Sequence, residues 1–321
     1  MIISVLGAGA FGTALAISLA HHDRRVYLWA RSEEHAEDMQ KTRENRRRLR
    51  GMRLHDLITP TADMRLAAQA DIILISVPMQ ALGRFLEAHG KLLDGKALVA
   101  CCKGVDLETG QGPAELVAAH CPGSTVAVLT GPGFAADIAG GLPTALTLAC
   151  QQEDAGMRLQ RNLTTANLRL YRSDDVLGAE LGGALKNIIA IACGGVMGMG
   201  LGESARAALM TRGFAEMQRI AFALGAQPGT LAGLSGFGDL VLTCTSPQSR
   251  NYSFGETMGR GEPFPPDVTV EGISTAEAVS VLAGKLGIDV PITDTVTALL
   301  TRKITVNEAM DSLLSRPLKK E

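Results

Sequence analysis

Lys186 is the residue of this sequence best suited to transfer a proton. It lies inside a long apolar stretch, residues 174–200, that has a helical pattern, with Gly182 and Gly183 one turn earlier. A lysine in such a helix must reach solvent or find a partner, and partial burial lowers its pKa, as proton-transferring lysines require. The alternative is a paired structural lysine, with the glycines allowing close packing of another helix.

Three further segments carry groups suited to an anionic ligand. Lys103 follows a predicted strand and precedes Gly104, so it offers a point charge beside accessible backbone. The loop 130–135 also follows a strand, and Gly131 and Gly133 let its amides face a ligand. In the third segment, Asp239 follows a glycine turn, and a polar helix start then supplies a hydroxyl, a guanidinium and an amide from Ser249, Arg250 and Asn251. Each segment alone is equally explained as a turn, a helix cap or a surface charge.

The N-terminus carries a GxGxxG motif whose glycines are Gly7, Gly9 and Gly12. The motif stands between a predicted strand, 2–6, and a predicted helix, 13–22, which is the context that dinucleotide binding requires. The glycines allow a tight turn, approach of backbone to a pyrophosphate, and close packing of helix on strand, while the helix N-terminus favours phosphate. We therefore expect a dinucleotide here, and a glycine turn used only for packing is the alternative.

Arg31 bears on which dinucleotide is bound. An acidic residue that reads the ribose is expected about 20 residues after the glycines, at the end of the second strand. Arg31 stands near that place, so a 2′-phosphate is accommodated and NADPH is the expected cofactor, with NADH as the alternative. Arg31 as a solvated charge at a helix entry is the competing interpretation.

The elements that position these residues fall into two halves. Apolar runs that read as strands alternate with helix-like stretches or turns up to about residue 174, which predicts a doubly wound parallel sheet of the Rossmann type. Those runs are 2–6, 25–29, 71–77, 97–101, 125–129, 144–149 and 168–171. Beyond residue 174 the pattern is helical, at 174–200, 203–224, 274–287, 291–302 and 305–315. We predict an NAD(P)-binding domain over 1–174 and an all-α substrate and catalytic domain over 175–321.

Composition excludes several classes of protein. The formal charge of the 321 residues is −2, from 31 basic and 33 acidic side chains, so bulk attraction to nucleic acid is not expected. The six cysteines have no metal-site spacing, which predicts no metal and reduced thiols in a cytoplasmic protein. No signal peptide is recognisable, and the most apolar window, 188–202, is too short for a membrane span.

The segment 41–53 carries seven Lys and Arg residues against a single Glu. A solvated loop on the rim of an anion site is preferred here over a nucleic-acid or membrane patch, given the acidic net charge.

Together these motifs resemble the bacterial-type NAD(P)H-dependent glycerol-3-phosphate dehydrogenases. The resemblance runs from the first strand to about residue 315. The words that carry it are GAGAFGTALA (7–16), CKGVDLETG (102–110), GPGFA (131–135), ELGGALKNIIAI (180–191), TRGFAEM (211–217), GFGDLVLTCTSPQSRN (236–251), VEG (270–272) and PIT (291–293). The resemblance implies a 6-phosphogluconate-dehydrogenase-like pair of domains and reversible reduction of dihydroxyacetone phosphate to sn-glycerol 3-phosphate for phospholipid synthesis.

The resemblance also implies roles for individual residues. The proton-transferring lysine falls on Lys186. Substrate contacts fall on Lys103, Gly131, Gly133, Asp239, Ser249, Arg250 and Asn251. Cofactor contacts fall on Gly7, Gly9, Ala10, Phe11, Gly12, Arg31, Lys103, Ala135, Arg250, Thr269 and Glu271. The chain departs from the usual pattern at Gly133, where Ser or Thr is common, at Ala10, where a small polar residue is common, and at 45–51, where arginines replace a Tyr and a Pro.

Two other functions are weighed against this one. A related two-domain 3-hydroxyacid dehydrogenase or ketopantoate-type reductase would not need the phosphate grip of 246–251. A non-enzymatic NADP(H)-sensing protein would leave Lys186 without a purpose. The expected partner is a small phosphorylated three-carbon substrate, with no nucleic acid and no membrane insertion, and the Gly- and Ala-rich helices are compatible with a homodimer.

Overall fold

The computed structural model describes residues 1–20, 24–265 and 268–314 of the chain. It divides into two compact units, Met1–Glu180 and Leu181–Glu321, called here the first and second units. The division lies within one long helix, six residues beyond the boundary that the sequence predicts.

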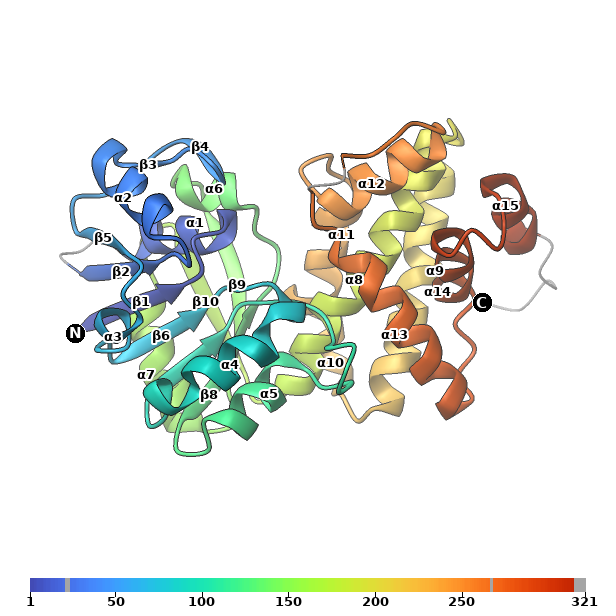
Figure 1. Ribbon diagram of the computed structural model, residues 1–321. Coiled ribbons are helices and arrows are strands. Elements are labelled where there is room, and N and C mark those ends of the chain that lie inside the picture. Colours follow the sequence, from blue (N-terminus) through green and yellow to red (C-terminus); the bar gives the residue numbers. More distant parts are fainter. Residues whose placement is uncertain (21–23, 266–267, 315–321) are drawn as a thin grey trace. The chain divides into compact units, whose positions relative to one another are not determined.

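The first unit is built on an eight-stranded sheet with strand order β10-β9-β8-β7-β6-β1-β2-β5 (Figure 1). The strands of this sheet are β1 (Ile2–Leu6), β2 (Arg25–Trp29), β5 (Ile58–Thr61), β6 (Ile72–Ile75), β7 (Ala97–Ala100), β8 (Thr125–Thr130), β9 (Thr144–Ala149) and β10 (Leu168–Ser173). Neighbouring strands are parallel except β8 and β9, which pair antiparallel with Thr130 opposite Thr147. The predicted sheet is therefore present, but its last two strands run against the others.

Helices cover both faces of the sheet. Alternate residues of the strands enter two apolar clusters, so that Ile72 and Leu74 face one layer and Ile73 and Ile75 the other. One layer contains α1 (Ala10–Leu19), α2 (Glu33–Thr42), α6 (Ala135–Ala139) and α7 (Glu153–Leu163). The other contains α3 (Met64–Ala67), α4 (Met79–Leu93), α5 (Pro113–His120) and the start of α8 (Val176–Gly198).

A two-stranded hairpin, β3 (Glu44–Asn45) and β4 (Leu49–Arg53), occupies the basic segment that the sequence analysis interprets as a loop. That expectation is wrong in its secondary structure. The run of arginines hides the pattern, because buried residues of this hairpin are few: Asn45 and Leu49 are buried, whereas Arg46, Arg47, Arg48 and Arg50 are exposed.

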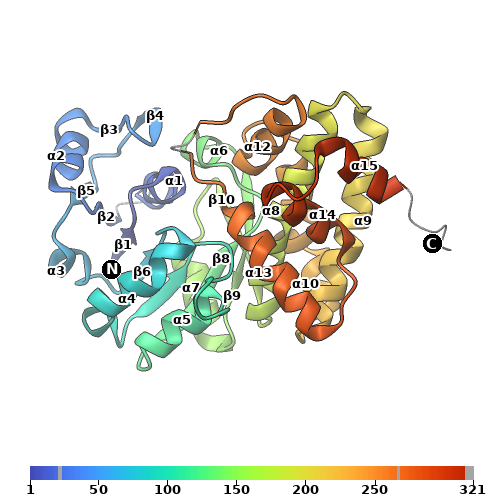
Figure 2. The same ribbon diagram turned by 45° about the vertical axis from the view of Figure 1, so that its right-hand side comes forward.

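The described residues of the second unit form helices and no strand (Figures 1 and 2). They are the remainder of α8, then α9 (Gly202–Ala223), α10 (Pro228–Ala232), a π-helical turn η1 (Leu234–Gly238), α11 (Asp239–Cys244), α12 (Arg250–Gly259), α13 (Glu271–Leu286), α14 (Pro291–Leu300) and α15 (Val306–Leu314). Helices α13 and α14 lie side by side in both views and in the packing. Helix α8 is long and apolar enough to cross a membrane, but 78% of its apolar window is buried inside the protein, as in a core helix.

Candidate active site

Lys186 lies below the surface of the second unit, with 7% of its side chain exposed. Its Nζ donates to Asp239 Oδ1 at 2.5 Å and to Thr243 Oγ1 at 2.7 Å. Thr243 Oγ1 in turn donates to the Asp239 carbonyl at 2.6 Å. A carboxylate in direct contact favours the charged form of an amine, so this arrangement holds an ammonium group in a site of low polarity.

The backbone around this lysine is packed without intervening side chains. A Cβ on Gly182 would lie 2.5 Å from the Ser235 carbonyl oxygen, so α8 and the η1 turn touch directly. The turn η1 is itself tight, and α11 starts immediately after it at Asp239. The glycine before Lys186 therefore serves close packing, and this packing presents Asp239 to the lysine.

Helix α12 crosses α8 through glycines. A Cβ on Gly194 or Gly198 of α8 would collide with the backbone carbonyl of Tyr252 or Glu256. On α12, Gly255 and Gly259 stand equally close to the backbone of α8. This crossing explains the glycines beyond Lys186, and it fixes the start of α12 beside α8.

The start of α12 carries the three predicted polar residues. Ser249 is its N-cap and accepts from the Tyr252 amide at 3.2 Å, so its hydroxyl is engaged in the helix. Asn251 is buried, donates to Asn187 Oδ1 at 2.9 Å and accepts from the Gly272 amide at 2.9 Å. Arg250 is exposed, with Nη2 3.8 Å from Glu271 Oε1. The structure thus brings together Arg250, Asn251 and Glu271.

Two residues of this cluster are missing from the sequence-based set. Thr243 contacts Lys186 directly. Asn187 is 3% exposed, and its Nδ2 is a buried donor without a hydrogen-bond partner, next to Lys186 in the sequence. Two features of the sequence point to these residues. Asn187 is a polar residue in an apolar helix, and Thr243 is spaced one helical turn from Asp239.

In the first unit, Lys103 follows β7 and Gly131 follows β8, at the carboxyl ends of neighbouring strands. Lys103 Nζ donates to the Gly131 carbonyl at 3.4 Å. The Thr130 hydroxyl is buried there without a hydrogen-bond partner. A Cβ on Gly133 would lie 3.1 Å from methyl groups of the Ile138 and Thr144 side chains. A Ser at this position would therefore require these two side chains to move slightly.

The glycine-rich turn fits a dinucleotide phosphate. Gly7 has φ +119°, and a Cβ there would collide with the Ser76 carbonyl. A Cβ on Gly12 would collide with the Gly7 carbonyl, whereas nothing lies within 4 Å of the Cβ direction of Gly9. Gly9 is the N-cap of α1, no side chain caps it, and the first turn has no acidic residue. The helix N-terminus therefore presents its amides beside open space, as phosphate binding requires.

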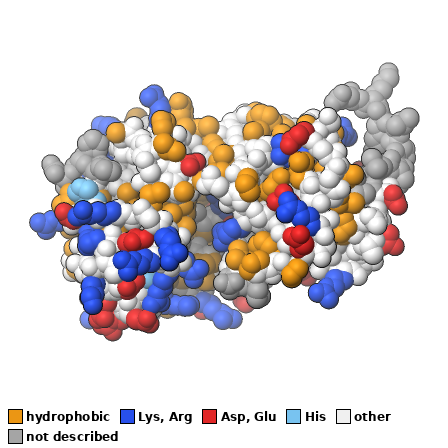
Figure 3. All heavy atoms as spheres, turned by 90° about the horizontal axis from the view of Figure 1, so that it is seen from above, with side chains coloured by type: hydrophobic (Ala, Val, Ile, Leu, Met, Phe, Trp, Pro, Cys, Tyr) orange, Lys and Arg blue, Asp and Glu red, His pale blue; other side chains and the backbone are white. Residues whose placement is uncertain are grey.

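The arginine hairpin is attached to this turn by Asn45. Its Nδ2 donates to the Ala8 carbonyl at 3.0 Å and to Thr13 Oγ1 at 2.7 Å, and its Oδ1 lies 3.0 Å from His35 Nε2. Arg47 also pairs with Glu34 of the first turn of α2 at 2.5 Å, one helical turn from Arg31. The hairpin thus borders both the glycine turn and the end of β2, where the adenosine ribose is read in this fold. In Figure 3 Lys and Arg side chains gather on the face of the first unit that carries α2 and this hairpin.

The remaining predicted cofactor residues lie at element ends. Ala10 and Phe11 begin α1, and Ala135 begins α6. Glu271 begins α13, which therefore starts three residues earlier than predicted. Thr269 is exposed just before α13.

Burial changes the titration of several groups. Desolvation raises the pKa of the Cys244 thiol well above its ordinary value, with further contributions from Cys193, so this thiol near Lys186 stays protonated. Burial raises the pKa of Glu180 to about 7 and raises that of Glu216, although each carboxylate accepts backbone N–H groups. Both are used at helix N-termini, Glu180 at α5 and Glu216 at α14.

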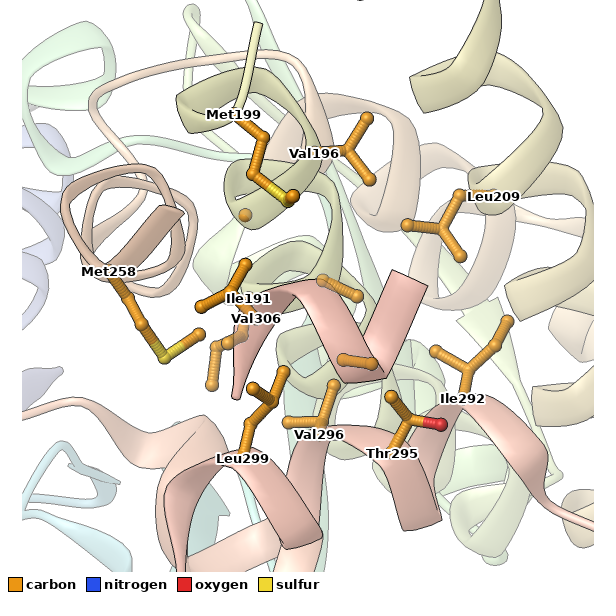
Figure 4. Close-up of a pocket in the computed structure, with 13 residues that line it drawn as sticks. Ile191, Val196, Met199, Leu209, Met258, Ile292, Thr295, Val296, Leu299 and Val306 are labelled. Carbon is orange, nitrogen blue, oxygen red and sulfur yellow. The ribbon is translucent and has the colours of Figure 1, made fainter. Parts of the chain in front are cut away.

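A small apolar cavity of about 40 Å³ lies in the second unit among α8, α9, α12, α14 and α15 (Figure 4). Side chains such as Ile191, Met199, Leu209 and Val296 point into it, and Thr295 is its polar residue. A cavity without charge does not suit a phosphorylated ligand, so the candidate site remains at Lys186.

Comparison with known proteins decides the family. Residues 2–156 match the profile described as the NAD-dependent glycerol-3-phosphate dehydrogenase N-terminus, and residues 175–311 match that of the C-terminus of the same family. The chain belongs to the NAD-dependent glycerol-3-phosphate dehydrogenase family.

Relatives within this family span the whole chain. The chain is 58% identical over 321 residues, all of both chains, to glycerol-3-phosphate dehydrogenase (NAD(P)+) of Ruegeria sp. TM1040. It is 60% identical to the enzyme of that name from Cereibacter sphaeroides, over 99% of this chain and all of the relative. The crystal structure of glycerol-3-phosphate dehydrogenase from Coxiella burnetii matches with a TM-score of 0.92 at 36% identity, covering 98% of each chain. The resemblance and the fold class inferred from the sequence are both confirmed.

Proposed function

We propose that this protein reduces dihydroxyacetone phosphate to sn-glycerol 3-phosphate with NAD(P)H, reversibly, and so supplies glycerol 3-phosphate for phospholipid synthesis. The observation that carries the proposal is the buried Lys186–Asp239–Thr243 cluster in a chain of the NAD-dependent glycerol-3-phosphate dehydrogenase family. The first unit would bind the cofactor and the second would supply most of the substrate contacts.

Lys186 is the proposed acid of this reaction. When bound, the nicotinamide supplies a hydride to the ketone carbon. The Lys186 ammonium polarises the ketone oxygen and gives it a proton as negative charge develops there, and in the reverse direction the amine accepts that proton. Asp239 keeps the group charged and Thr243 fixes its position. Asn187, whose Nδ2 has no partner, would donate to a substrate oxygen.

Arg250 and Lys103 are the proposed cations for the substrate phosphate. Arg250 is held at the start of α12, and its planar guanidinium suits two phosphate oxygens. Lys103 stands beside Gly131 at the carboxyl edge of the sheet and would contact both substrate and cofactor. Ser249 and Asn251 would act mainly by holding this helix start in place, because their polar atoms are bonded within the protein.

We propose NADPH as the preferred cofactor. Arg31 at the end of β2 would meet the 2′-phosphate, and the neighbouring hairpin would add Arg48 and Arg50, both exposed. Arg31→Ala and Arg48→Ala are expected to raise KM for NADPH several-fold while KM for NADH changes little. Arg84→Ala, on the exposed face of α4, is the control. Equal effects on both cofactors would argue against reading of the 2′-phosphate.

A spectrophotometric assay tests the reaction. Oxidation of NADPH on addition of dihydroxyacetone phosphate is expected, and its absence would reject the proposal. Lys186→Ala should lower kcat by several orders of magnitude with NADPH affinity nearly unchanged, and retained kcat would remove Lys186 from its role. Turnover with hydroxyacids or ketopantoate instead would favour the related reductases, and NADPH binding without turnover would favour a sensor.

We further propose a cytoplasmic enzyme that acts as a homodimer, without nucleic-acid or membrane partners. Six unbridged thiols support a reducing compartment, and fractionation of the source cell tests it. Sedimentation of the purified protein tests the dimer.

A further inference from the structure

We propose that Glu180 is a positioning residue for this reaction, whose carboxylate fixes the segment 103–112, and Lys103 with it, to helix α8. The inference rests on the proposed function, where Lys103 is assigned to substrate and cofactor. Glu180 touches neither, and it acts through the segment that begins at Lys103.

The contact joins α8 to the N-terminus of α5 within the first unit. Glu180 Oε1 accepts from the Ala114 amide at 2.6 Å, and a Cβ on Gly112 would lie 2.7 Å from Oε2. Gly112, the N-cap of α5, has no side chain to cap the helix, and Pro113 has no N–H. The carboxylate of a distant helix therefore takes the place of a local cap.

Hydrogen bonds carry this attachment back toward Lys103. Next to Gly112, the Gln111 carbonyl accepts from the Asp106 amide at 3.0 Å, which closes the segment into a compact turn. The Asp106 carboxylate stiffens this turn by accepting from the amide and hydroxyl of Thr109. Two residues from Lys103, the Val105 carbonyl accepts from Gln80 Nε2 at 2.8 Å. If the segment were released at Gly112, the hydrogen bond from Gln80 would be the remaining one of these contacts that lies nearest to Lys103.

The charge of Glu180 matters for the strength of this contact. The positive end of the α5 dipole and the Ala114 amide favour the carboxylate, whereas burial and the nearby Glu115 in the first turn of α5 oppose it. Because the resulting pKa is about 7, the capping carboxylate gains its full charge only above neutral pH.

Three variants of the full chain test the proposal, with NADPH present. Glu180→Ala removes the contact, and Glu180→Gln keeps an acceptor oxygen but no charge. Glu216→Ala is the matched control, because Glu216 is another buried carboxylate that accepts from a helix N-terminus, that of α14, outside the Lys103 segment. We expect Glu180→Ala to speed amide hydrogen exchange over 104–111 at least tenfold and to raise KM for dihydroxyacetone phosphate about tenfold, with a smaller change in kcat. Glu216→Ala should lower the melting temperature without either effect.

The pH dependence separates positioning from mere stability. Glu180→Gln mimics the protonated residue, so the ratio of its KM to that of the wild type should approach one below pH 6 and depart from one above pH 7, where the wild-type carboxylate is charged. The substrate phosphate titrates equally in both proteins and cancels in the ratio.

The proposal is overturned if exchange over 104–111 is unchanged in Glu180→Ala, or if Glu216→Ala changes KM as much. A ratio that stays flat with pH would likewise count against it. Should the wild type not turn over dihydroxyacetone phosphate at all, the proposed function fails, and the exchange measurement still reports whether Glu180 holds the segment.

Discussion

Lys186 is buried, and a buried ammonium group without a partner would lower the stability of the fold. Removing one member of a buried ion pair leaves the other uncompensated and typically costs about 3–5 kcal/mol. Under the proposed mechanism Asp239 would serve both stability and chemistry, so its substitution would confound the two. Thr243 separates them better, because its hydroxyl contacts Lys186 and yet carries no charge.

Thr243→Val is expected to lower kcat about 10- to 100-fold, the effect of losing a hydrogen bond worth roughly 1–3 kcal/mol. The change keeps the shape of the side chain but removes the acceptor for Lys186 Nζ and the donor to the Asp239 carbonyl. Thr245→Val is the control, since Thr245 makes the same kind of bond to Val241 on the exposed side of α11. Steady-state kinetics should show a loss only in the first variant, and equal losses in both would contradict the role of Thr243.

Glu180 makes stability depend on pH. Its pKa is about 7 in the folded protein against 4.5 ordinarily, so the folded state binds its proton more tightly. Its contribution is fully present below pH 4.5, falls as pH rises through 7, and amounts to about 3 kcal/mol. Denaturant unfolding at pH 5 and pH 8 should therefore show Glu180→Gln gaining stability relative to the wild type at the higher pH. No relative gain would mean that the carboxylate is not desolvated.

The charged residues of the candidate site could be predicted from the sequence, but their uncharged neighbours could not. Lys186 and Asp239 were identifiable because each is a polar residue in an unusual context. Asn187 is also a polar residue in an apolar helix, and Thr243 lies one helical turn from Asp239, but the partner of an uncharged polar side chain becomes clear only when the opposite helix is known. The three-dimensional crossing of α8, η1 and α11 supplies that information.

The crossing of α8 and α12 brings the two helix backbones into direct contact through glycines. The glycines of α8 after Lys186 indicate that another element packs closely there, but a glycine pattern does not say which element it is. The partner is the helix that begins with Ser249, Arg250 and Asn251. The hairpin β3–β4 escaped prediction because so few of its residues are buried.

Gly255→Ala tests this crossing. Alanine is favoured over glycine in helices by about 1 kcal/mol, yet here its Cβ would collide with the Ile191 carbonyl, so we expect destabilisation of a few kcal/mol and a raised KM for substrate. Gly284→Ala is the control, because Gly284 lies in α13 with nothing within 4 Å and should stabilise the protein. Thermal melts compare the two, and the same sign for both would contradict the crossing.

The molecule as a whole has almost no net charge to attract its anionic ligands. With a formal charge of −2, the proposed binding of these ligands would depend on placed cations such as Arg31, Lys103 and Arg250. The sequence predicted the division into a strand-rich and a helical half, because periodicity changes near residue 174. It did not predict the reversal at β9, because apolar strands read alike in both directions.

Salt should therefore weaken the discrimination between cofactors. The exposed arginines that would read the 2′-phosphate are screened, whereas buried contacts are not, so the KM ratio of NADH to NADPH should fall several-fold between about 50 and 500 mM salt. Kinetics with both cofactors in potassium chloride measure this ratio. A ratio independent of salt would point to a buried 2′-phosphate site.

All six cysteines are buried, Cys101, Cys102, Cys121 and Cys150 in the first unit and Cys193 and Cys244 in the second. A thiol reagent that cannot enter the folded protein can modify them only during an opening event. Mass spectrometry of partly modified protein would then measure the rate of opening of each unit separately. It would show which unit opens first and in which unit a bound cofactor slows the opening.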